Sequence, residues 1–295
     1  MSGYLSLSVE LQGLDPDSAE AACFAAGALS VTLTDAVDDA ILEPAPGEVR
    51  LWPQTVLQAL FPAAAAGPQA IIALAGALDL PPSRIHAQHV AERVWEREWL
   101  KVFHAMRFGR RLWIVPSHEP LPQDPQAVAV RLDPGLAFGT GTHPSTALCL
   151  TWLDAHLAPG STVIDYGCGS GVLALAAAQL GARAVHAFDI DPQALLATRD
   201  NAAANGLGAR IHVHADAGTL PPQADVVLAN ILAGTLVELA PRLCGGLAPG
   251  GQLVLAGILR QQVHEVRAGF APWLDLDVFA EREGWSALSG RRPVG

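Results

Sequence analysis

A carboxylate and a series of glycines follow one apolar stretch near the middle of the chain. The segment VIDYGCGSG places Asp165 just before Gly167, Gly169 and Gly171, and an apolar run typical of a helix, VLALAAAQLG, comes next. Glycine adopts positive φ and lets the backbone approach a ligand closely, so the pattern indicates a ligand-binding crevice at a sheet edge. Val172 stands where a dinucleotide fingerprint has its third glycine, which argues against a nicotinamide cofactor. Without a ligand, the same pattern is a tight strand-to-helix turn.

Carboxylates also follow the next two apolar runs. Asp189 ends the run AVHAFD, 22 residues after Gly167, where a carboxylate can accept hydrogen bonds from both ribose hydroxyls of a nucleoside. Asp191 and Pro192 have the types expected of a helix cap and a first helical position, so we assign Asp191 a structural role. Asp216 follows the run IHVH. It is suited either to binding an adenine amino group or to a solvent-exposed turn.

Two further segments carry polar side chains suited to a reaction. Asn230 ends the run ADVVLAN; its amide can anchor a ligand and accept a hydrogen bond from an amine, or it can cap a helix starting at Ile231. His143 lies in the loop LDPGLAFGTGTHPST and is either a proton acceptor or a polar surface residue. The composition of this loop is typical of a ligand-covering loop. Its glycines and hydroxyl residues are Gly135, Gly139, Gly141, Thr140, Thr142, Ser145 and Thr146.

These residues require a sheet that brings several strand ends together. From about residue 128, apolar runs alternate with helical stretches that begin or end at glycine or proline, which predicts a parallel, doubly wound α/β sheet. Two further runs, 274–281 and 285–289, flank Glu283 and Gly284 as in a hairpin and predict an antiparallel strand at the end of the sheet. The runs assigned to parallel strands are STVID, AVHAFD, IHVH, ADVVLAN and GQLVLAGI.

The first third of the chain has a different pattern. Apolar and polar residues alternate strictly over 5–12, which predicts a half-buried strand. Asp15 and Pro16 then predict the start of a helix that closes at Gly27. Strands over 29–34, from residue 49 onwards and over 84–90, with a second helix over 70–80, complete the order β, α, β, β, α, β. This order predicts a small ferredoxin-like α+β domain.

We therefore expect a ferredoxin-like domain over 1–93 and an α/β domain over 128–295. Between them, residues 94–127 form a tryptophan-rich linker that carries Trp95, Trp99 and Trp113. Packing between domains accounts for these rings.

Charge is distributed unevenly between the parts. The 295 residues have a formal net charge of −11. Residues 1–93 hold 11 acidic and 3 basic residues, a net −8, and residues 94–295 hold 18 and 15, a net −3. An acidic chain lacks the basic surface that nucleic-acid binding usually requires, so we expect a basic partner and no nucleic acid.

Composition excludes several other classes of protein. The chain is 51% apolar and 16% charged, which excludes intrinsic disorder, and its apolar runs are too short to span a membrane. Because the sequence starts without a basic and then apolar leader segment, we expect a cytoplasmic protein, and we expect it to be a monomer. The cysteines Cys23, Cys149, Cys168 and Cys244 have no paired spacing, and the histidine pairs 86 with 89 and 212 with 214 have no carboxylate or cysteine companion, so we expect neither disulfide nor metal.

The motifs VIDYGCGSG, FDIDP and VVLANIL, in this order, resemble those of class I S-adenosylmethionine-dependent methyltransferases. The first domain, the segment WEREW and the loop FGTGTHPST narrow the resemblance to the ribosomal protein L11 methyltransferase family. The resemblance covers essentially the whole chain. It implies a seven-stranded, mostly parallel Rossmann-like sheet, a first domain that recruits the substrate, and repeated methylation of the N-terminal α-amine and lysine side chains of the basic protein L11.

The resemblance also implies roles for individual residues. Thr146, Gly167 and Gly169 contact S-adenosylmethionine, and Asp165 approaches its methionine amino group, directly or through water. Asp189 binds the ribose, and Asn230 lies near the methyl group as the catalytic residue. Ser145 departs from the family loop, which often has a threonine there, but it retains a hydroxyl.

Other activities remain compatible with the residues alone. The same fold serves RNA and small-molecule methyltransferases, although ANIL replaces the Asn-Pro-Pro-aromatic motif of enzymes that modify amides and bases, and no stripe of aromatic and basic residues is present. A nucleoside-binding protein without turnover and a dehydrogenase are further alternatives.

Overall fold

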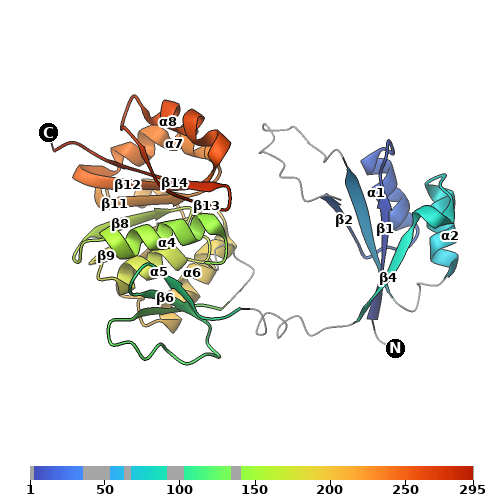
Figure 1. Ribbon diagram of the computed structural model, residues 1–295, viewed down its shortest axis with the longest axis horizontal. Coiled ribbons are helices and arrows are strands. Elements are labelled where there is room, and N and C mark those ends of the chain that lie inside the picture. Colours follow the sequence, from blue (N-terminus) through green and yellow to red (C-terminus); the bar gives the residue numbers. More distant parts are fainter. Residues whose placement is uncertain (1–2, 36–53, 63–67, 92–102, 134–140, 295) are drawn as a thin grey trace. The chain divides into compact units, whose positions relative to one another are not determined.

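The structure is a computed structural model that describes residues 3–35, 54–62, 68–91, 103–133 and 141–294. The chain divides into two units, Met1–Glu98 and Trp99–Gly295 (Figure 1). The domain boundary that we predict after residue 93 lies outside the described residues, as do Trp95 and Trp99.

The first unit is a four-stranded antiparallel sheet with two helices. Its strands lie in the order β2-β3-β1-β4, which is the order of a ferredoxin-like fold and confirms the predicted α+β domain. The elements are β1 (Gly3–Glu10), α1 (Pro16–Ala25), β2 (Ser30–Asp35), β3 (Thr55–Pro62), α2 (Pro68–Ala77), the 3-10 helix η1 (Pro82–Arg84) and β4 (His86–Ala91).

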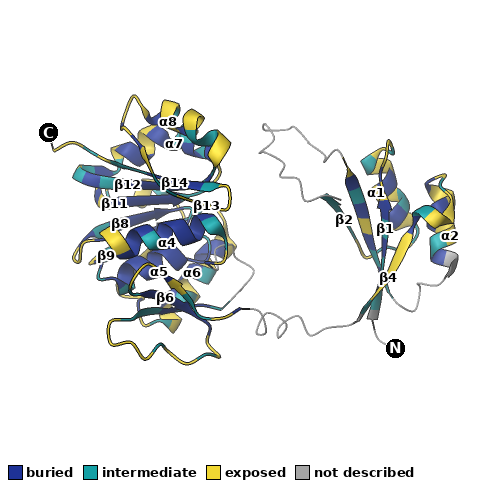
Figure 2. Ribbon diagram, in the orientation of Figure 1, coloured by how far each residue is buried: buried dark blue, intermediate teal, exposed yellow. Residues whose placement is uncertain are grey.

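Local sequence explains this unit well. Alternation in β1 buries Leu5, Leu7 and Val9, and buried residues of both helices join them in a single core (Figure 2). Helix α1 begins where Asp15 accepts a hydrogen bond from the backbone N–H of Ser18 at 2.9 Å, with proline at the first helical position.

The predicted linker 94–127 is corrected in part by the structure. Strand β6 (Leu112–Val115) pairs with β5 (Met106–Phe108) on one side and with β7 (Val128–Arg131) on the other, in a three-stranded sheet that belongs to the second unit. Buried Leu112 and Ile114 join the core of that unit. The strands are only three and four residues long, too short for a period of two to be recognised in the sequence. Trp113 lies in β6.

The second unit contains the predicted seven-stranded sheet, in the order β10-β9-β8-β11-β12-β14-β13. The first five of these strands are parallel, and β14 is antiparallel to both β12 and β13, which confirms the terminal hairpin. The strands are β8 (Thr162–Tyr166), β9 (Ala184–Phe188), β10 (Ile211–His214), β11 (Ala224–Asn230), β12 (Leu247–Leu259), β13 (Asp277–Arg282) and β14 (Trp285–Arg291).

Helices cover both faces of this sheet. Buried residues of α4, α5 and α6 form one core, and those of α7 and α8 form another (Figure 2). Strand order reverses between β8 and β11, the position at which doubly wound sheets bind ligands. None of the described helices is long and apolar enough to cross a membrane. The helices are α4 (Pro144–His156), α5 (Val172–Gln179), α6 (Pro192–Ala204), α7 (Ala233–Gly245) and α8 (Val263–Phe270), with the 3-10 helices η3 (Ala217–Thr219) and η4 (Arg260–Gln262).

Candidate active site

Strand register brings three of the predicted residues to one edge of the sheet. Tyr166 of β8 pairs with Phe188 of β9, and it lies between Phe188 and Ala229 of β11. The residues that follow them, Gly167, Asp189 and Asn230, therefore leave the parallel strands at the same level. They lie beside the reversal of strand order between β8 and β11, where ligands are expected.

The turn after β8 requires its glycines. Gly167, Gly169 and Gly171 have φ values of +82°, +53° and +80°, a region that other residues adopt at a cost of about 1–2 kcal/mol. A Cβ on Gly167 would lie 2.4 Å from Cγ2 of Ile231, and one on Gly171 would lie 2.8 Å from the Thr198 hydroxyl. The backbone here is thus packed too closely for any side chain.

Neighbouring elements hold this turn in place. The carbonyl of Phe188 accepts hydrogen bonds from the backbone N–H groups of Gly167 at 2.8 Å and Cys168 at 3.0 Å. From α6, the Thr198 hydroxyl donates to the carbonyl of Gly169 at 3.0 Å, and Asn201 Nδ2 donates to the carbonyl of Ser170 at 2.9 Å. The glycine turn is therefore organised before any ligand binds.

Asp189 and Asp191 perform separate tasks. Asp189 accepts hydrogen bonds from the backbone N–H groups of Gly169 at 2.9 Å and of Asp191 at 3.0 Å, one on each carboxylate oxygen. Asp191 accepts from the N–H of Gln193 at 2.8 Å and caps α6, as its sequence context predicts. Asp189 is half-buried and lines the cavity described below.

Asp165 is fully buried at the end of β8. Its Oδ2 accepts a hydrogen bond from the N–H of Ala174 at 3.0 Å, in the first turn of α5, whereas its Oδ1 has no partner among the described residues. Burial raises the pKa of Asp165 to about 7; the nearby charge of Asp189 adds to this effect and the bond from Ala174 opposes it. An unpaired, buried carboxylate oxygen suits a cationic group of a ligand.

The side chains of Asn230 and Thr146 form a hydrogen bond. Nδ2 of Asn230 donates a hydrogen bond to Oγ1 of Thr146 at 3.1 Å. Thr146 lies in the first turn of α4 and is 1% exposed. The alternative role of Asn230 as a helix cap is wrong, because α7 starts at Ala233 after Leu232, and no side chain caps it.

His143 begins α4 beside the same site. Its Nδ1 lies 2.7 Å from the hydroxyl of Ser145 and accepts the backbone N–H of Ser145 at 3.3 Å, so His143 is the N-cap. Its ring packs edge-on against Trp285, with centroids 4.6 Å apart. Burial lowers the pKa of His143, which favours the neutral ring that the cap requires. The loop residues 134–140, with Gly135, Gly139 and Thr140, lie outside the described residues.

These elements enclose a cavity of about 820 Å³ at the carboxyl edge of the sheet. Among the predicted residues, Gly167, Gly169, Asp189 and Asn230 line it, whereas the buried Asp165 and Thr146 do not. Asp216 does not line it. This aspartate is exposed and accepts the N–H of Gly218 at 2.8 Å, which agrees with the turn role.

Sequence reasoning missed the apolar walls of the cavity. Ile190 and Leu232 line it although they are 87% and 57% exposed, and the rings of Phe188 and Trp285 line it as well. The sequence does contain a signal for two of these wall residues. Ile190 and Leu232 are apolar residues within polar turns that follow strand ends. Exposed apolar side chains beside a cavity suit a flat, apolar ligand group such as a nucleobase.

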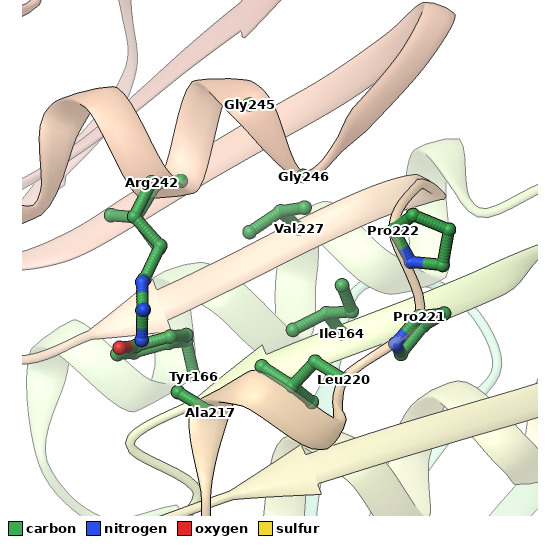
Figure 3. A pocket seen from close by; sticks show the side chains of 11 residues that line it. Ile164, Tyr166, Ala217, Leu220, Pro221, Pro222, Val227, Arg242, Gly245 and Gly246 are labelled. Atoms are coloured by element: carbon green, nitrogen blue, oxygen red, sulfur yellow. The ribbon is translucent and has the colours of Figure 1, made fainter.

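A smaller pocket of about 240 Å³ lies on the α7 side of β8 and β11 (Figure 3). Its walls include Ile164, Leu220 and Val227, and Figure 3 shows Arg242 and the ring of Tyr166 pointing toward one another at one end. None of the predicted site residues lines this pocket, so we place the candidate active site in the larger cavity.

The histidines of β9 and β10 lie next to one another. His186 Nδ1 is 3.0 Å from His214 Nε2, and the ring of His212 stacks on His186. Within the described ranges, no group of three or more histidine, cysteine or acidic residues has the arrangement of a metal site.

Comparison with known proteins identifies the family. A family model described as ribosomal protein L11 methyltransferase (PrmA) matches residues 3–293. The ribosomal protein L11 methyltransferase of Pseudomonas aeruginosa is 53% identical over 292 residues, or 98% of each chain. That of Vibrio cholerae is 52% identical over 273 residues, or 90% of each chain.

The chain belongs to the ribosomal protein L11 methyltransferase family. A crystal structure of ribosomal protein L11 methylase from Lactobacillus delbrueckii subsp. bulgaricus is 34% identical and superposes with a TM-score of 0.60, covering 65% of this chain and 100% of that one. Family and fold confirm the resemblance seen in the sequence and the predicted Rossmann-like methyltransferase sheet.

Membership of an L11 methyltransferase family also confirms S-adenosylmethionine as the expected cofactor. Two observations indicate that the residues present fit it. The unpaired Oδ1 of Asp165 matches the need of an α-ammonium group for a carboxylate, and Gly167 and Gly169, which have no side chains, line the cavity. The apolar walls at Ile190 and Leu232 suit the adenine ring.

Proposed function

We propose that this protein transfers methyl groups from S-adenosylmethionine to amino groups of ribosomal protein L11, on lysine side chains and on the N-terminal α-amine. The observation that carries the proposal is the meeting of the glycine turn, Asp189 and Asn230 around one cavity of about 820 Å³. The relatives from Pseudomonas and Vibrio, named for L11, support the choice of substrate.

Four residues hold the cofactor in this proposal. Gly167 and Gly169 let the backbone approach it, Asp189 accepts from its ribose hydroxyls, and Asp165 binds its ammonium group, directly or through water. Asn230 lies near its methyl group. The cofactor supplies an electrophilic methyl group whose leaving group is a neutral thioether. Asp189 suits its role because two backbone N–H groups already orient its carboxylate.

Asn230 is the catalytic residue for the incoming amine. An ammonium ion has no lone pair, so the amine must be neutral when it reacts. Asn230 Oδ1 accepts an N–H of the neutral amine and directs its lone pair, because its Nδ2 is engaged by Thr146. Asn230 would thereby align the amine nitrogen with the methyl group of a bound cofactor, and the proton that the methylated amine loses would pass to water.

The described cavity wall offers no uncommitted general base for that proton. His143 uses Nδ1 to cap α4, and Asp189 is held by two backbone donors. Alignment of the reacting atoms therefore provides most of the acceleration; orientation of this kind contributes roughly 7 kcal/mol or more in intramolecular comparisons.

The first unit recruits L11 in this proposal. Its described part carries one basic residue, Arg84, against six acidic ones. Complementary charge speeds and orients the encounter with a basic partner. The same charge disfavours nucleic acid, and we propose a cytoplasmic monomer that acts on a protein. The acidic residues are Glu10, Asp15, Asp17, Glu20, Asp35 and Asp79.

Purified protein incubated with unmethylated L11 and cofactor labelled in its methyl group tests the proposal. We expect label in L11, on lysines and the N-terminus after proteolysis, and none in a ribosomal RNA fraction. Cofactor binding measured by calorimetry serves as the control for an active preparation. Binding without transfer to L11 contradicts the substrate, and transfer to RNA contradicts the class of substrate.

A further inference from the structure

Ile231, the residue that follows Asn230, lies at the end of β11 between two glycines from the neighbouring strands. We propose that Ile231 is a positioning residue, and that its packing against Gly167 and Gly257 fixes the place of the Asn230 amide at the cavity. The proposal deepens the function proposed above and rests on it. Ile231 acts on the reaction through its neighbour in the chain.

The side chain of Ile231 packs against the glycine turn after β8. A Cβ on Gly167 would lie 2.4 Å from Cγ2 of Ile231 and 3.9 Å from its Cβ. Apart from the adjoining residues of the turn, the described residues place no other atom within 4 Å of that position. The methyl branch of Ile231 therefore occupies the space that a side chain on Gly167 would need.

The backbone of Ile231 packs against β12, on the opposite side of β11 from β8. Asn230 pairs with Ala256 in the parallel ladder of β11 and β12, so Gly257 comes next beside Ile231. A Cβ on Gly257 would lie 2.3 Å from the carbonyl oxygen of Ile231 and 2.9 Å from its carbonyl carbon. Gly257 also has a φ of +80°. Only glycine lets β12 approach the end of β11 so closely.

An irregularity in β12 brings Gly257 to this position. The antiparallel register of β12 with β14 shifts between Leu255 and Ile258, as at a β-bulge. A bulge bends its strand and increases the local twist, and bulges are common beside active sites. Both Gly257 and Ile231 line the cavity. The bulge thus directs β12 against the end of β11 at the level of the site.

Loss of this packing is expected to move Asn230 rather than the glycine turn. Hydrogen bonds from the turn to β9, and from α6 to the turn, hold it independently of Ile231. Asn230 is half-buried, and among the described residues its side chain has one hydrogen-bond partner, Thr146. One peptide unit links Asn230 to Ile231, so a fixed residue 231 restricts where the amide can lie.

Two substitutions of Ile231 separate position from burial. Valine keeps Cγ2 and loses the terminal methyl group, whereas leucine keeps the volume of isoleucine and loses the branch on Cβ. We expect Ile231→Leu to lower kcat for L11 by roughly 10- to 100-fold, the scale of a misplacement of about 1 Å, and Ile231→Val to lower it by less than about threefold. If Ile231 provided only buried apolar surface, leucine would be the better replacement. A larger loss in Ile231→Val than in Ile231→Leu therefore overturns the proposal.

Gly257→Ala tests the contact with the backbone. We expect it to lower kcat by roughly 10-fold or more while the cofactor still binds, because its Cβ displaces the Ile231 carbonyl. Gly160→Ala is the matched control, since Gly160 has a φ of +83° and nothing within 4 Å of a Cβ. It is expected to keep the wild-type kcat. Equal kcat values in Gly257→Ala and Gly160→Ala overturn the role of Gly257, and if Gly257→Ala does not fold, the two Ile231 variants decide.

A readout that is independent of turnover separates this proposal from the function it rests on. In cofactor-free protein, the nuclear Overhauser effect between the Asn230 side-chain NH₂ and the Thr146 side chain is expected to persist in Ile231→Val and to weaken in Ile231→Leu. An unchanged effect in Ile231→Leu overturns the positioning role. A higher cofactor Kd with unchanged kcat also overturns it, because Ile231 would then be a cofactor contact only.

Failure of the proposed function gives a different result. Wild-type protein that binds cofactor and does not methylate L11, while the two Ile231 variants differ in the Overhauser effect as expected, contradicts the substrate and leaves the positioning of Asn230 supported.

Discussion

The carboxylate of Asp189 accepts the backbone N–H of Gly169 at 2.9 Å, which ties the end of β9 to the glycine turn after β8. Two parts of the site that come from separate strands therefore share one hydrogen bond. The carboxylate is oriented in the absence of any ligand, with its other oxygen held by the N–H of Asp191 at 3.0 Å. Such preorganisation lowers the cost of ordering the site on binding.

Asp189→Asn is expected to weaken cofactor binding roughly 10- to 100-fold, because hydrogen bonds to a charged acceptor contribute about 1.5–3 kcal/mol. Calorimetric titration with cofactor measures the change. Asp191→Asn is the matched control, since asparagine caps a helix as well as aspartate does, and its Kd and Tm are expected to match the wild type. Equal affinities for the wild type and Asp189→Asn contradict the ribose role.

Asp165→Asn is expected to stabilise the cofactor-free protein at pH 8 and to weaken cofactor binding. The pKa of Asp165 is raised to about 7 in the folded state, above its unfolded value of 3.8. The folded state therefore favours the neutral carboxyl of Asp165. This preference contributes fully to the free energy of unfolding below pH 3.8, and the contribution is lost as the pH rises through 7.

Unfolding by urea at pH 5 and pH 8 measures this effect. Asparagine carries no charge to bury. We therefore expect Asp165→Asn to raise the free energy of unfolding at pH 8 by about 1–3 kcal/mol, the usual cost of an unmatched buried group. The gain should be smaller at pH 5. The same difference at both pH values means that Asp165 does not carry a buried charge at pH 8.

Gly167→Ala tests the close packing of the turn. Alanine at this position would have to adopt a φ of +82°, and its Cβ would lie only 2.4 Å from Ile231 Cγ2. Gly206→Ala is the matched control, because Gly206 has φ +68° and open space around its Cα. We expect Gly206→Ala to cost about 1–2 kcal/mol of unfolding free energy and Gly167→Ala to cost more, with loss of cofactor binding only in the latter. Normal cofactor affinity in Gly167→Ala contradicts the close approach.

Salt is expected to weaken capture of L11 more than binding of the cofactor. The first 93 residues carry a net charge of −8, and the rest of the chain carries −3. Attraction between exposed charges is screened as ionic strength rises. Measuring KM for L11 and Kd for the cofactor between low and physiological salt checks this. Parallel changes in the two constants contradict recruitment through the acidic unit.

The sequence predicts the central strands β8 and β11 because they are largely buried and so form apolar runs. The hairpin of β13 and β14 is also predicted, from Glu283 and Gly284. Strands β5 and β6 are not, because three or four residues show no period. Motif positions predict which strand ends carry Asp189 and Asn230.

The contact between Asn230 and Thr146 could not be predicted from the sequence. It joins α4 to β11 across 84 residues, and no local pattern specifies it. The sequence also does not predict the apolar cavity walls, because Trp285 reaches the cavity only through the antiparallel pairing of β14 with β12. Local sequence therefore identifies the elements and the strand-end residues, and tertiary packing determines which side chains meet.

Mass spectrometry of L11 tests the central claim, methylation of L11 amines at the Asn230 end of the cavity. L11 is isolated from cells that lack this enzyme and carry either the wild-type gene or Asn230→Ala at equal expression. We predict that wild-type protein adds several methyl groups to lysines and to the N-terminal amine, and that Asn230→Ala leaves these amines largely unmodified while still binding cofactor. Unmethylated L11 with the wild-type gene, or full methylation with Asn230→Ala, would contradict it.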